Sequence, residues 1–333
     1  MKFLVIGSGS IGKRHMRNLL ALGAKSSDIS AVDTREDRRK EVGALGVPNV
    51  YASFDEALAA GVYDAAIVCS PTSMHIQQGT ELAKRGTHIL MEKPLDRDLQ
   101  GIAGFRRAVA DKKVYVAMAY IFRSTPLADK VKALLAEKVI GKVIYVRGEF
   151  SEYLPDWHPY EDYRSFYMAE KSQGGGSILD QSHIMDLVHH LLGGFKSVYA
   201  FNSKISSLEI NADDIAEMVV TLKSGAIASI HTDIFGRDHK KMLEIKGEKG
   251  NIAWDHYANQ VRVYDAATKS TQVFTKFPTD FNLNYIEQMR RFIDGCKGGK
   301  PDLATLDEGI ETMELILAAE KSHETGKVEP VGG

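Results

Sequence analysis

The chain has 333 residues, 44% of them hydrophobic and 26% charged, so it can bury the cores of about two domains. Its 42 basic and 44 acidic side chains nearly balance, which excludes the basic surface expected for binding nucleic acid or an anionic membrane. No apolar run approaches the roughly 20 residues that span a bilayer, and we expect no signal peptide. The two cysteines, Cys69 and Cys296, form neither a disulfide framework nor a metal-ligand spacing. We therefore expect a cytoplasmic protein that holds no metal ion.

Residues 1 to about 122 alternate short apolar runs with longer amphipathic stretches. The apolar runs predict strands at 3–6, 29–32, 65–69, 88–91 and 114–118. The stretches between them predict helices at 11–22, 36–45, 74–85 and 99–110. Apolar strands that alternate with helices are typical of a parallel sheet covered by helices, so we expect an α/β Rossmann domain, doubly wound, over residues 1–122.

The pattern changes after residue 123 to longer strands with few helices between them. The predicted strands are 143–150, 198–204, 215–222, 226–235, 242–246 and 261–264. Helices are predicted at 127–137, 283–296 and 306–325. Consecutive strands joined by tight turns favour an antiparallel sheet. We therefore expect an α+β domain over 123–333 with an open, mostly antiparallel sheet, whose last helix, about 304–325, is a candidate to pack back on the first domain.

A glycine-rich motif, G-x-G-x-x-G, runs from Gly7 to Gly12 between a predicted strand and a predicted helix. Gly7 permits the tight turn, Gly9 lets the backbone approach a pyrophosphate, and Gly12 lets the helix and the strand pack closely. Ser10 and Ile11 open the helix, whose N–H groups and positive dipole end would face the phosphates. The motif therefore predicts a dinucleotide site, and the alternative is a glycine turn that binds nothing.

An acidic residue, Asp33, ends the second predicted strand about twenty residues after this motif. Its carboxylate can accept hydrogen bonds from the adenosine ribose hydroxyls, which favours NAD over NADP. Arg35 leaves NADP open as the alternative cofactor, because a guanidinium there can pair with a 2′-phosphate or stack on adenine.

A Glu92-Lys93-Pro94 segment follows the predicted strand 88–91. In open α/β sheets, ligands bind beyond the carboxyl ends of the strands, and Pro94 restricts the backbone of Lys93 to extended conformations. The Lys93 ammonium could stabilise negative charge on a carbinol oxygen. The alternative is a solvated Glu–Lys pair in a surface turn.

A glycine-rich segment, 174–176, opens a predicted helix that runs to about residue 192. At 100° per residue, Asp180 lies within the apolar stripe of this helix, and His183 lies on the same side. A buried carboxylate is costly unless it is paired or functional, and a carboxylate beside an imidazole suits general acid–base chemistry. Two alternatives remain, a capped core helix with a hydrogen-bonded histidine and a metal site made by His183, Asp186 and His190.

Together these segments resemble the glucose–fructose oxidoreductase/inositol dehydrogenase (Gfo/Idh/MocA) family over nearly the whole chain. The matching motifs are 7–15, 69–75, 92–94, 140–142 and 174–186. The resemblance implies a Rossmann domain followed by a substrate domain whose sheet often forms an oligomer interface. It assigns the catalytic lysine to Lys93 and the catalytic histidine to His183. The turn implied to line the nicotinamide side of the cofactor, together with Glu92, contains Cys69, Ser70, Pro71, Thr72 and His75.

The resemblance also has one departure and one branch-specific feature. Inositol-dehydrogenase-like members usually place Asp four residues before His, whereas Asp180 lies three residues before His183. The aromatic loop 153–167 resembles a branch associated with surface-polysaccharide and sugar-nucleotide pathways, and its aromatic rings suit sugar C–H surfaces. The expected substrate contacts are Tyr120, Arg123, Trp157, His158, Tyr163 and Arg164. The alternative is that the loop's aromatic rings form a small core beneath it.

These interpretations combine into one hypothesis, the reversible NAD(P)-dependent oxidation of a secondary hydroxyl on a sugar, amino sugar, sugar acid or nucleotide sugar. Lys93 would hold the reacting oxygen, His183 would exchange its proton, and Asp180 would orient His183 or a substrate hydroxyl. The alternatives are an NAD-dependent glycosidase with transient oxidation and a non-catalytic dinucleotide sensor. The expected partners are a small carbohydrate and further copies of the chain, in a homodimer or homotetramer.

Overall fold

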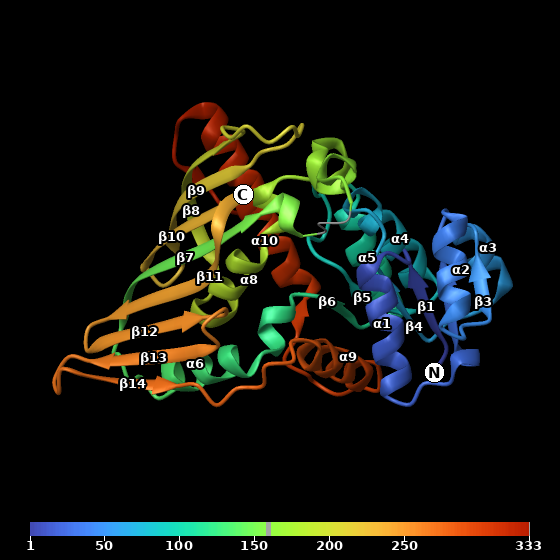
Figure 1. Cartoon of the computed structure of the whole chain (residues 1–333), viewed down its shortest axis with the longest axis horizontal. Helices are drawn as coiled ribbons and strands as arrows, with labels where there is room; N and C mark the ends of the chain where they lie inside the picture. The colour runs from blue at the N-terminus through green and yellow to red at the C-terminus, as the bar shows by residue number, and fades with distance from the viewer. Residues whose placement is uncertain (158–160, 333) are drawn as a thin grey trace. The chain divides into compact units, whose positions relative to one another are not determined.

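The computed structural model describes residues 1–157 and 161–332, which separate into two units (Figure 1). The first unit comprises Met1–Ser124 and Phe281–Leu306. The second unit comprises Thr125–Asp280 and Asp307–Gly333. The expected division after residue 122 therefore differs from the observed one, because a later segment belongs with the first unit.

Two elements account for this return of the chain to the first unit. β15 (Ala304–Thr305) pairs with β6 (Val116–Met118), and α9 (Asn282–Cys296) contacts α1 (Ser10–Ala21). The C-terminal helix α10 (Leu306–Thr325), a candidate for packing on the first domain, belongs to the second unit apart from Leu306. Residues 281–306 therefore belong to the first unit, because β15 is hydrogen-bonded to its edge strand β6.

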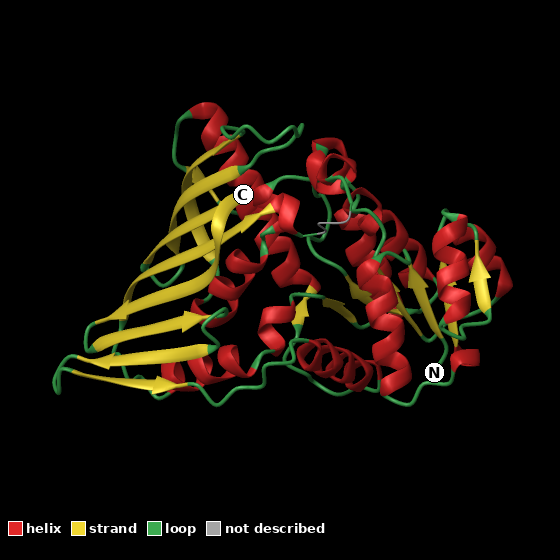
Figure 2. Ribbon diagram, in the orientation of Figure 1, coloured by secondary structure: helices red, strands yellow, loops and turns green. Residues whose placement is uncertain are grey.

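The first unit is built on a seven-stranded sheet in the order β15-β6-β5-β4-β1-β2-β3. Its parallel strands are β1 (Phe3–Ile6), β2 (Ile29–Val32), β3 (Asn49–Tyr51), β4 (Ala65–Val68), β5 (His88–Met91) and β6. Every residue of β1, β2 and β4 is buried, because helices cover both faces (Figure 2). The remaining helices of this unit are α2 (Glu36–Ala44), α3 (Phe54–Ala60), α4 (His75–Lys84) and α5 (Ile102–Lys112). The strand order reverses between β1 and β4, which is where such sheets bind ligands.

The second unit is built on a nine-stranded sheet in the order β14-β13-β12-β11-β7-β10-β9-β8-β16. Its strands are β7 (Val143–Tyr153), β8 (Phe195–Ser203), β9 (Ile215–Leu222), β10 (Ile227–Asp233), β11 (Phe235–Gly247), β12 (Gly250–Asp255), β13 (Gln260–Asp265), β14 (Ser270–Phe274) and β16 (Glu329–Pro330). All neighbouring pairs are antiparallel except β7 with β10. The predicted fold class is therefore confirmed, although β3, β12, β14, β15 and β16 were not predicted.

Helices line one face of this second sheet and leave the other face uncovered in the described part of the chain (Figure 2). These helices are α6 (Pro126–Ala136), α7 (Ser177–Asp180), α8 (His183–Leu192) and α10. Residues along β9 are alternately buried and more exposed, as expected for a sheet with one packed face.

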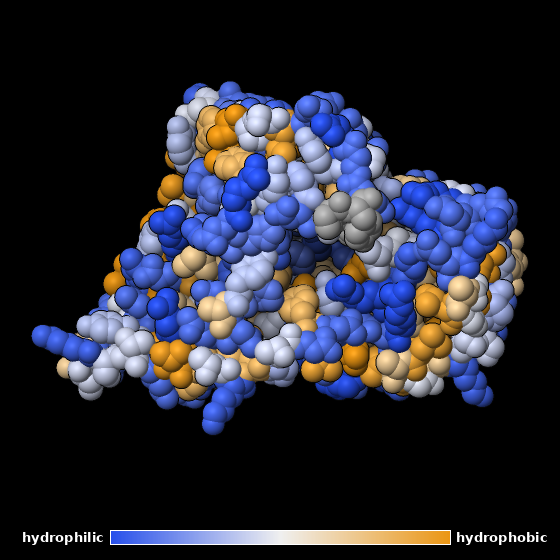
Figure 3. Space-filling model, in the orientation of Figure 1, coloured by the Kyte–Doolittle hydropathy of each residue, from blue (hydrophilic) through white to orange (hydrophobic). Residues whose placement is uncertain are grey.

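The face drawn in Figure 3 is mostly hydrophilic, and its hydrophobic side chains form separate patches. Among the described residues, we find no helix that combines the length and the apolar character needed to cross a membrane.

Candidate active site

The glycine loop lies between β1 and α1, at the carboxyl edge of the first sheet. Gly7 has φ +89°, and a Cβ there would lie 2.3 Å from the carbonyl oxygen of Cys69. A Cβ on Gly12 would lie 2.0 Å from the carbonyl oxygen of Gly7. Gly9 is the N-cap residue of α1 and supplies no side-chain hydrogen bond, and the nearest atom to a Cβ there would be 3.8 Å away. The loop is therefore a backbone cradle at an uncapped helix N-terminus, which fits a pyrophosphate.

The Asp33 carboxylate ties the glycine loop to the end of β2. Its Oδ2 accepts from the backbone N–H of Ser8 at 2.7 Å, and its Oδ1 accepts from that of Arg35 at 2.9 Å. The side chain is buried, so the charge is held at one place. An ionised carboxylate has about four lone-pair positions, so these two contacts leave capacity for ribose hydroxyls.

Three arginines lie near Asp33, and they differ in their contacts. Arg39 donates to the backbone carbonyl oxygens of Asp33 and Thr34, each at 2.8 Å. Arg35 is exposed and donates two hydrogen bonds to Asp37, at 3.1 and 2.5 Å, which lowers the pKa of Asp37 to about 2. Arg38 lies 3.8 Å from Asp33 Oδ2 and is also the nearest side chain to Gly9. Arg38, which was not predicted from the sequence, is therefore better placed than Arg35 to meet a ligand at the loop.

The turn after β4 is held to the turn after β5 by His75. Its Nδ1 lies 2.9 Å from the carbonyl oxygen of Pro94, and its Nε2 lies 2.9 Å from that of Ser70. The Ser70 hydroxyl donates to Gln78 at 2.6 Å. His75 and Thr72 are both buried, so these side chains shape the turn. Their contact with a cofactor stays a prediction.

The Glu92-Lys93-Pro94 segment begins directly after β5. Glu92 Oε1 lies 2.9 Å from His15 Nε2 on α1, and Glu92 Oε2 accepts from the backbone N–H of Lys93 at 3.3 Å. The Lys93–Pro94 peptide bond is cis. Glu92 is therefore bonded to the helix that follows the glycine loop, so it is not a solvated partner of Lys93 in a surface turn.

Two predicted substrate contacts, Tyr120 and Arg123, lie in the segment after β6. Each exposes only 1% of its surface. Burial of a guanidinium requires paired partners, so Arg123 is built into the first unit. This burial favours a supporting role for both residues over direct contact with a substrate.

In the second unit, the predicted continuous helix is interrupted at Gln181 and Ser182, between α7 and α8. Gln181 donates its side-chain amide to the carbonyl oxygen of Asp233 on β10 at 2.7 Å, and the Ser182 N–H bonds to the carbonyl oxygen of Leu179 at 3.3 Å. Across this tighter turn, successive residues no longer rotate by the 100° per residue of a regular α-helix. The angular argument made from the sequence therefore does not apply across the break.

Asp180 and His183 occupy the two sides of this interruption. Asp180 is 7% exposed, and the Tyr167 hydroxyl donates to its Oδ1 at 2.6 Å. His183 is partly buried, and its ring stacks on that of Phe150, with the ring centres 6.1 Å apart. Tyr167, which was not predicted as a site residue, therefore holds the carboxylate that we expected to orient a substrate or His183.

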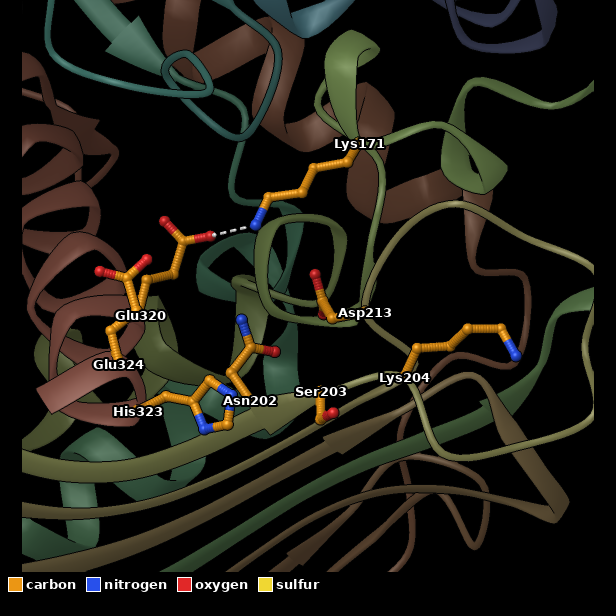
Figure 4. A pocket seen from close by; sticks show the side chains of 8 residues that line it. All are labelled: Lys171, Asn202, Ser203, Lys204, Asp213, Glu320, His323 and Glu324. Carbon is orange, nitrogen blue, oxygen red and sulfur yellow. Dashed lines mark ion pairs between the residues drawn. The ribbon is translucent and has the colours of Figure 1, made fainter. Parts of the chain in front are cut away.

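Asp213 caps α7 and separates it from a polar cavity of about 220 Å³ (Figure 4). Asp213 Oδ2 accepts from the Ser177 hydroxyl at 2.8 Å and from the Ile178 N–H at 2.9 Å. Across the cavity, Lys171 pairs with Glu320 at 3.4 Å. None of the site residues predicted from the sequence lines this cavity, so we do not assign it to catalysis.

The aromatic loop packs largely against itself and its neighbours. Trp157 and Tyr163 pack on a core made by Leu154, Met168, Leu208 and Ile234. Arg164 donates to Asp162 within the loop at 3.1 Å and to Glu209 outside the loop at 2.5 Å, so carboxylates already pair with its guanidinium. The small-core interpretation therefore accounts for these residues, and their contact with substrate stays a prediction. His158 lies outside the described residues.

A further group of side chains, here called the Lys241 cluster, lies on the helix-covered face of the second sheet. Its members are Phe150, Glu152, Lys241, His256 and Tyr257. Lys241 is the cross-strand partner of Phe150, and its Nζ lies 4.8 Å from the centre of the Phe150 ring. Lys241 also pairs with Glu152 at 2.9 Å, and the Tyr257 hydroxyl donates to the same carboxylate at 2.9 Å. The cluster adjoins His183 through the Phe150 ring.

The charges in the Lys241 cluster balance. Lys241 and Glu152 each expose about one-sixth of their side chains or less, at 16% and 14%. Burial, followed by the nearby Lys241 charge, lowers the pKa of His256 to about 4, so this imidazole is neutral at pH 7. The cluster therefore offers a donor, an acceptor and aromatic faces without a net charge.

Two family models match almost the whole chain. Residues 1–120 match the Gfo/Idh/MocA model described as the oxidoreductase family, NAD-binding Rossmann fold. Residues 132–332 match the model described as the oxidoreductase family, C-terminal alpha/beta domain. The chain belongs to the Gfo/Idh/MocA oxidoreductase family.

This member of the Gfo/Idh/MocA family is similar along nearly its full length to proteins named as sugar and inositol dehydrogenases. It is 28% identical to myo-inositol 2-dehydrogenase of Thermotoga maritima, over 97% of this chain and 96% of that protein. It is 26% identical to D-xylose 1-dehydrogenase (NADP+) 2 of Haloferax volcanii, over 98% of both. Levoglucosan dehydrogenase, in complex with NADH and levoglucosan, has a similar fold, with a TM-score of 0.87, 19% identity and 100% of both chains covered. The predicted family and the predicted NAD-binding Rossmann domain are therefore confirmed.

The residues that sequence reasoning missed in this Gfo/Idh/MocA protein share one property. Arg38, Tyr167 and the Lys241 cluster carry no local motif, and their partners come from other elements. For Lys241 a weak signal existed, because a lysine at an inward position of a strand, alternating with Leu243 and Ile245, breaks an otherwise apolar face.

Proposed function

We propose that the chain catalyses the reversible NAD-dependent oxidation of a secondary hydroxyl on a sugar, cyclitol or sugar derivative. The observation that carries this proposal is the position of Lys93. It follows β5, and the glycine loop follows β1, so both lie beyond the carboxyl ends of parallel strands in one sheet. The relatives named above act on inositol, xylose and levoglucosan according to their names, which supports a polyhydroxyl substrate.

Lys93 hydrogen-bonds the reacting oxygen and stabilises the negative charge that develops on it. The bound nicotinamide supplies the hydride acceptor in this reaction. The glycine loop and Asp33 hold the dinucleotide through backbone N–H groups and a buried carboxylate.

His183 takes the hydroxyl proton during oxidation and returns it during reduction. A positioned base of this kind contributes about 10²–10⁴-fold to the rate. Stacking on Phe150 limits the rotation of the His183 ring. Asp180, held by the Tyr167 hydroxyl, accepts a hydrogen bond from His183 or from a substrate hydroxyl.

The Lys241 cluster binds the part of the substrate that does not react. Glu152 accepts and Lys241 donates, so the pair suits two neighbouring hydroxyls, while the Phe150 face suits C–H groups. The balanced charge of this cluster favours an uncharged ring over a carboxylate or a phosphate at this position.

The choice of cofactor depends on two other residues. The Asp33 carboxylate favours NAD, and the Arg38 guanidinium is the group that would pair with the 2′-phosphate of NADP.

The test is NADH formation with a panel of sugars and cyclitols by the wild type, Lys93→Met and His183→Ala. Lys84→Met, at an exposed position on α4, serves as the matched control. We expect the two site variants to lose about 10²–10⁴-fold in kcat, with NADH still bound, as measured by fluorescence titration. Equal turnover by all four proteins would refute the assignment, and sugar cleavage without net NADH would indicate a glycosidase.

We also propose that the uncovered face of the second sheet binds another copy of the chain. Tyr199, Phe201, Val219 and Ile227 are 37–53% exposed on three adjacent strands, and Tyr199 lies directly opposite Val219. Contiguous exposed apolar side chains mark interaction surfaces. Analytical ultracentrifugation should show an oligomer that Val219→Lys weakens, whereas Val62→Lys, at a 74% exposed position of the first unit, should not. A monomeric wild type would contradict this assignment.

A further inference from the structure

Three metal-ligating side chains from separate segments converge beside the glycine loop of the first unit. His15 lies on α1, Cys69 follows β4, and Glu92 follows β5. One ligand atom of each lies within 4.8 Å of the ligand atoms of the other two. Among residues 1–157 and 161–332, no other three such ligands lie this close together. His183, Asp186 and His190, which the sequence offered as an alternative metal site, therefore do not form such a group.

The three side chains already form a partly enclosed arrangement. His15 is fully buried, the Glu92 side chain is 12% exposed, and His15 Nε2 lies 2.9 Å from Glu92 Oε1. Cys69 is partly buried.

We propose that His15, Cys69 and Glu92 bind one zinc ion, and that the bound zinc competes with the dinucleotide. Imidazole nitrogen, thiolate sulfur and carboxylate oxygen are the ligands that zinc uses in proteins, and three of them leave its fourth position open. Magnesium and calcium prefer all-oxygen ligands, so the sulfur and nitrogen select against them.

Coordination requires two changes at the ligands. The Cys69 S–H bond breaks as the sulfur–zinc bond forms, and the proton leaves to solvent, so zinc affinity should rise with pH. His15 Nε2 exchanges its hydrogen bond with Glu92 for the metal and carries its proton on Nδ1. Among the described residues, His15 Nδ1 has no hydrogen-bond partner, and this missing support should keep the affinity below that of a structural zinc centre.

The competition follows from the position of Cys69 and rests on the proposed function. The carbonyl oxygen of Cys69 lies 2.3 Å from where a Cβ of Gly7 would be, so the cysteine packs directly against the glycine loop. A zinc ion with its remaining water ligand would occupy the space beside this loop, where we place the nicotinamide end of the cofactor.

The experiment is a direct zinc titration against a chromogenic chelator, with the wild type, Cys69→Ser and Cys296→Ser. Cys296 is the matched control, because it is the other cysteine of the chain and lies on α9, outside the group. We expect one zinc per chain for the wild type and Cys296→Ser, and binding weakened at least about 100-fold in Cys69→Ser. With cobalt in place of zinc, a thiolate charge-transfer band should appear in the first two proteins and not in Cys69→Ser.

Absence of stoichiometric zinc from the wild type, or equal binding by Cys69→Ser, would overturn the site. If Cys69→Ser fails to fold, as judged by thermal denaturation, the cobalt band in the wild type and in Cys296→Ser decides the question. NADH titrations with and without zinc test the competition, and an unchanged NADH affinity at one bound zinc would overturn it. A failure to bind NADH without zinc would instead count against the proposed function.

Discussion

Replacing Gly12 by alanine should damage the cofactor loop, although alanine is the better helix former. The Cβ of the new alanine would lie 2.0 Å from the Gly7 carbonyl oxygen and 3.0 Å from its carbon. A comfortable C···O contact is about 3.3 Å, so the helix and the loop must separate by roughly 1.3 Å. Overpacking of this kind costs up to about 3 kcal/mol, and helix propensity returns about 1 kcal/mol. We therefore expect a net loss of about 2 kcal/mol in stability.

Gly43→Ala supplies the matched control for this prediction. Gly43 lies inside α2, and no heavy atom lies within 4 Å of its ideal Cβ position. This variant should gain about 0.5–1 kcal/mol, because alanine restricts the unfolded chain and suits a helix. The two substitutions are chemically identical, so only the surroundings of the two glycines separate their outcomes.

The assay is differential scanning calorimetry of both variants, together with fluorescence titration of NADH. A displaced Gly7–Gly9 backbone should lower NADH affinity at least about tenfold in Gly12→Ala, which corresponds to about 1.4 kcal/mol. Gly43→Ala should bind NADH as the wild type does. The reasoning is refuted if Gly12→Ala is as stable as Gly43→Ala and binds NADH with unchanged affinity.

Three further outcomes are expected. Asp33→Ala removes the acceptor of the Ser8 N–H and should weaken NAD binding by about 1.5–3 kcal/mol, with NADP binding affected less. An unchanged ratio of NAD affinity to NADP affinity in cofactor titrations would contradict this. Burial alone would lower the pKa of His231, but Asp233 and Glu217 raise it to about 9, so His231 stabilises the fold most below pH 6.5. The stability gap to His231→Gln, about 1 kcal/mol in urea titrations, should therefore shrink as the pH rises through 9, and a gap that grows would exclude this account. Asp213→Ala leaves two α7 donors without their acceptor and should cost about 2–3 kcal/mol in thermal denaturation, whereas a neutral effect would show that the cap is dispensable.

The parts of the site predicted from the sequence are those whose geometry is local. Gly7, Gly9 and Gly12 lie within six residues of one another, and the strand before them and the helix after them are visible as periodicity. Lys93 was predicted for the same reason, since it directly follows an apolar strand. The resemblance to the Gfo/Idh/MocA family then supplied roles that these local patterns do not contain.

Other features depend on strand order and register, which no local pattern encodes. His15 and Glu92 are 77 residues apart in the sequence, and they meet because β1, β4 and β5 are neighbours in the sheet. Lys241 meets Phe150 and Glu152 through the register of β11 against β7. The helix is interrupted between α7 and α8, where Gln181 bonds to β10, so a helical wheel does not describe Asp180 and His183 together.

The sequence by itself determined the NAD-binding fold and the glycine cradle. These follow from backbone conformation and from alternation of apolar side chains, which are properties of short segments. Tertiary structure alone decided that Arg164 pairs with Glu209, that 281–306 belongs to the first unit, and that His15, Cys69 and Glu92 meet. The physical reason is that proximity between distant segments is set by how strands pair and helices pack across the whole unit.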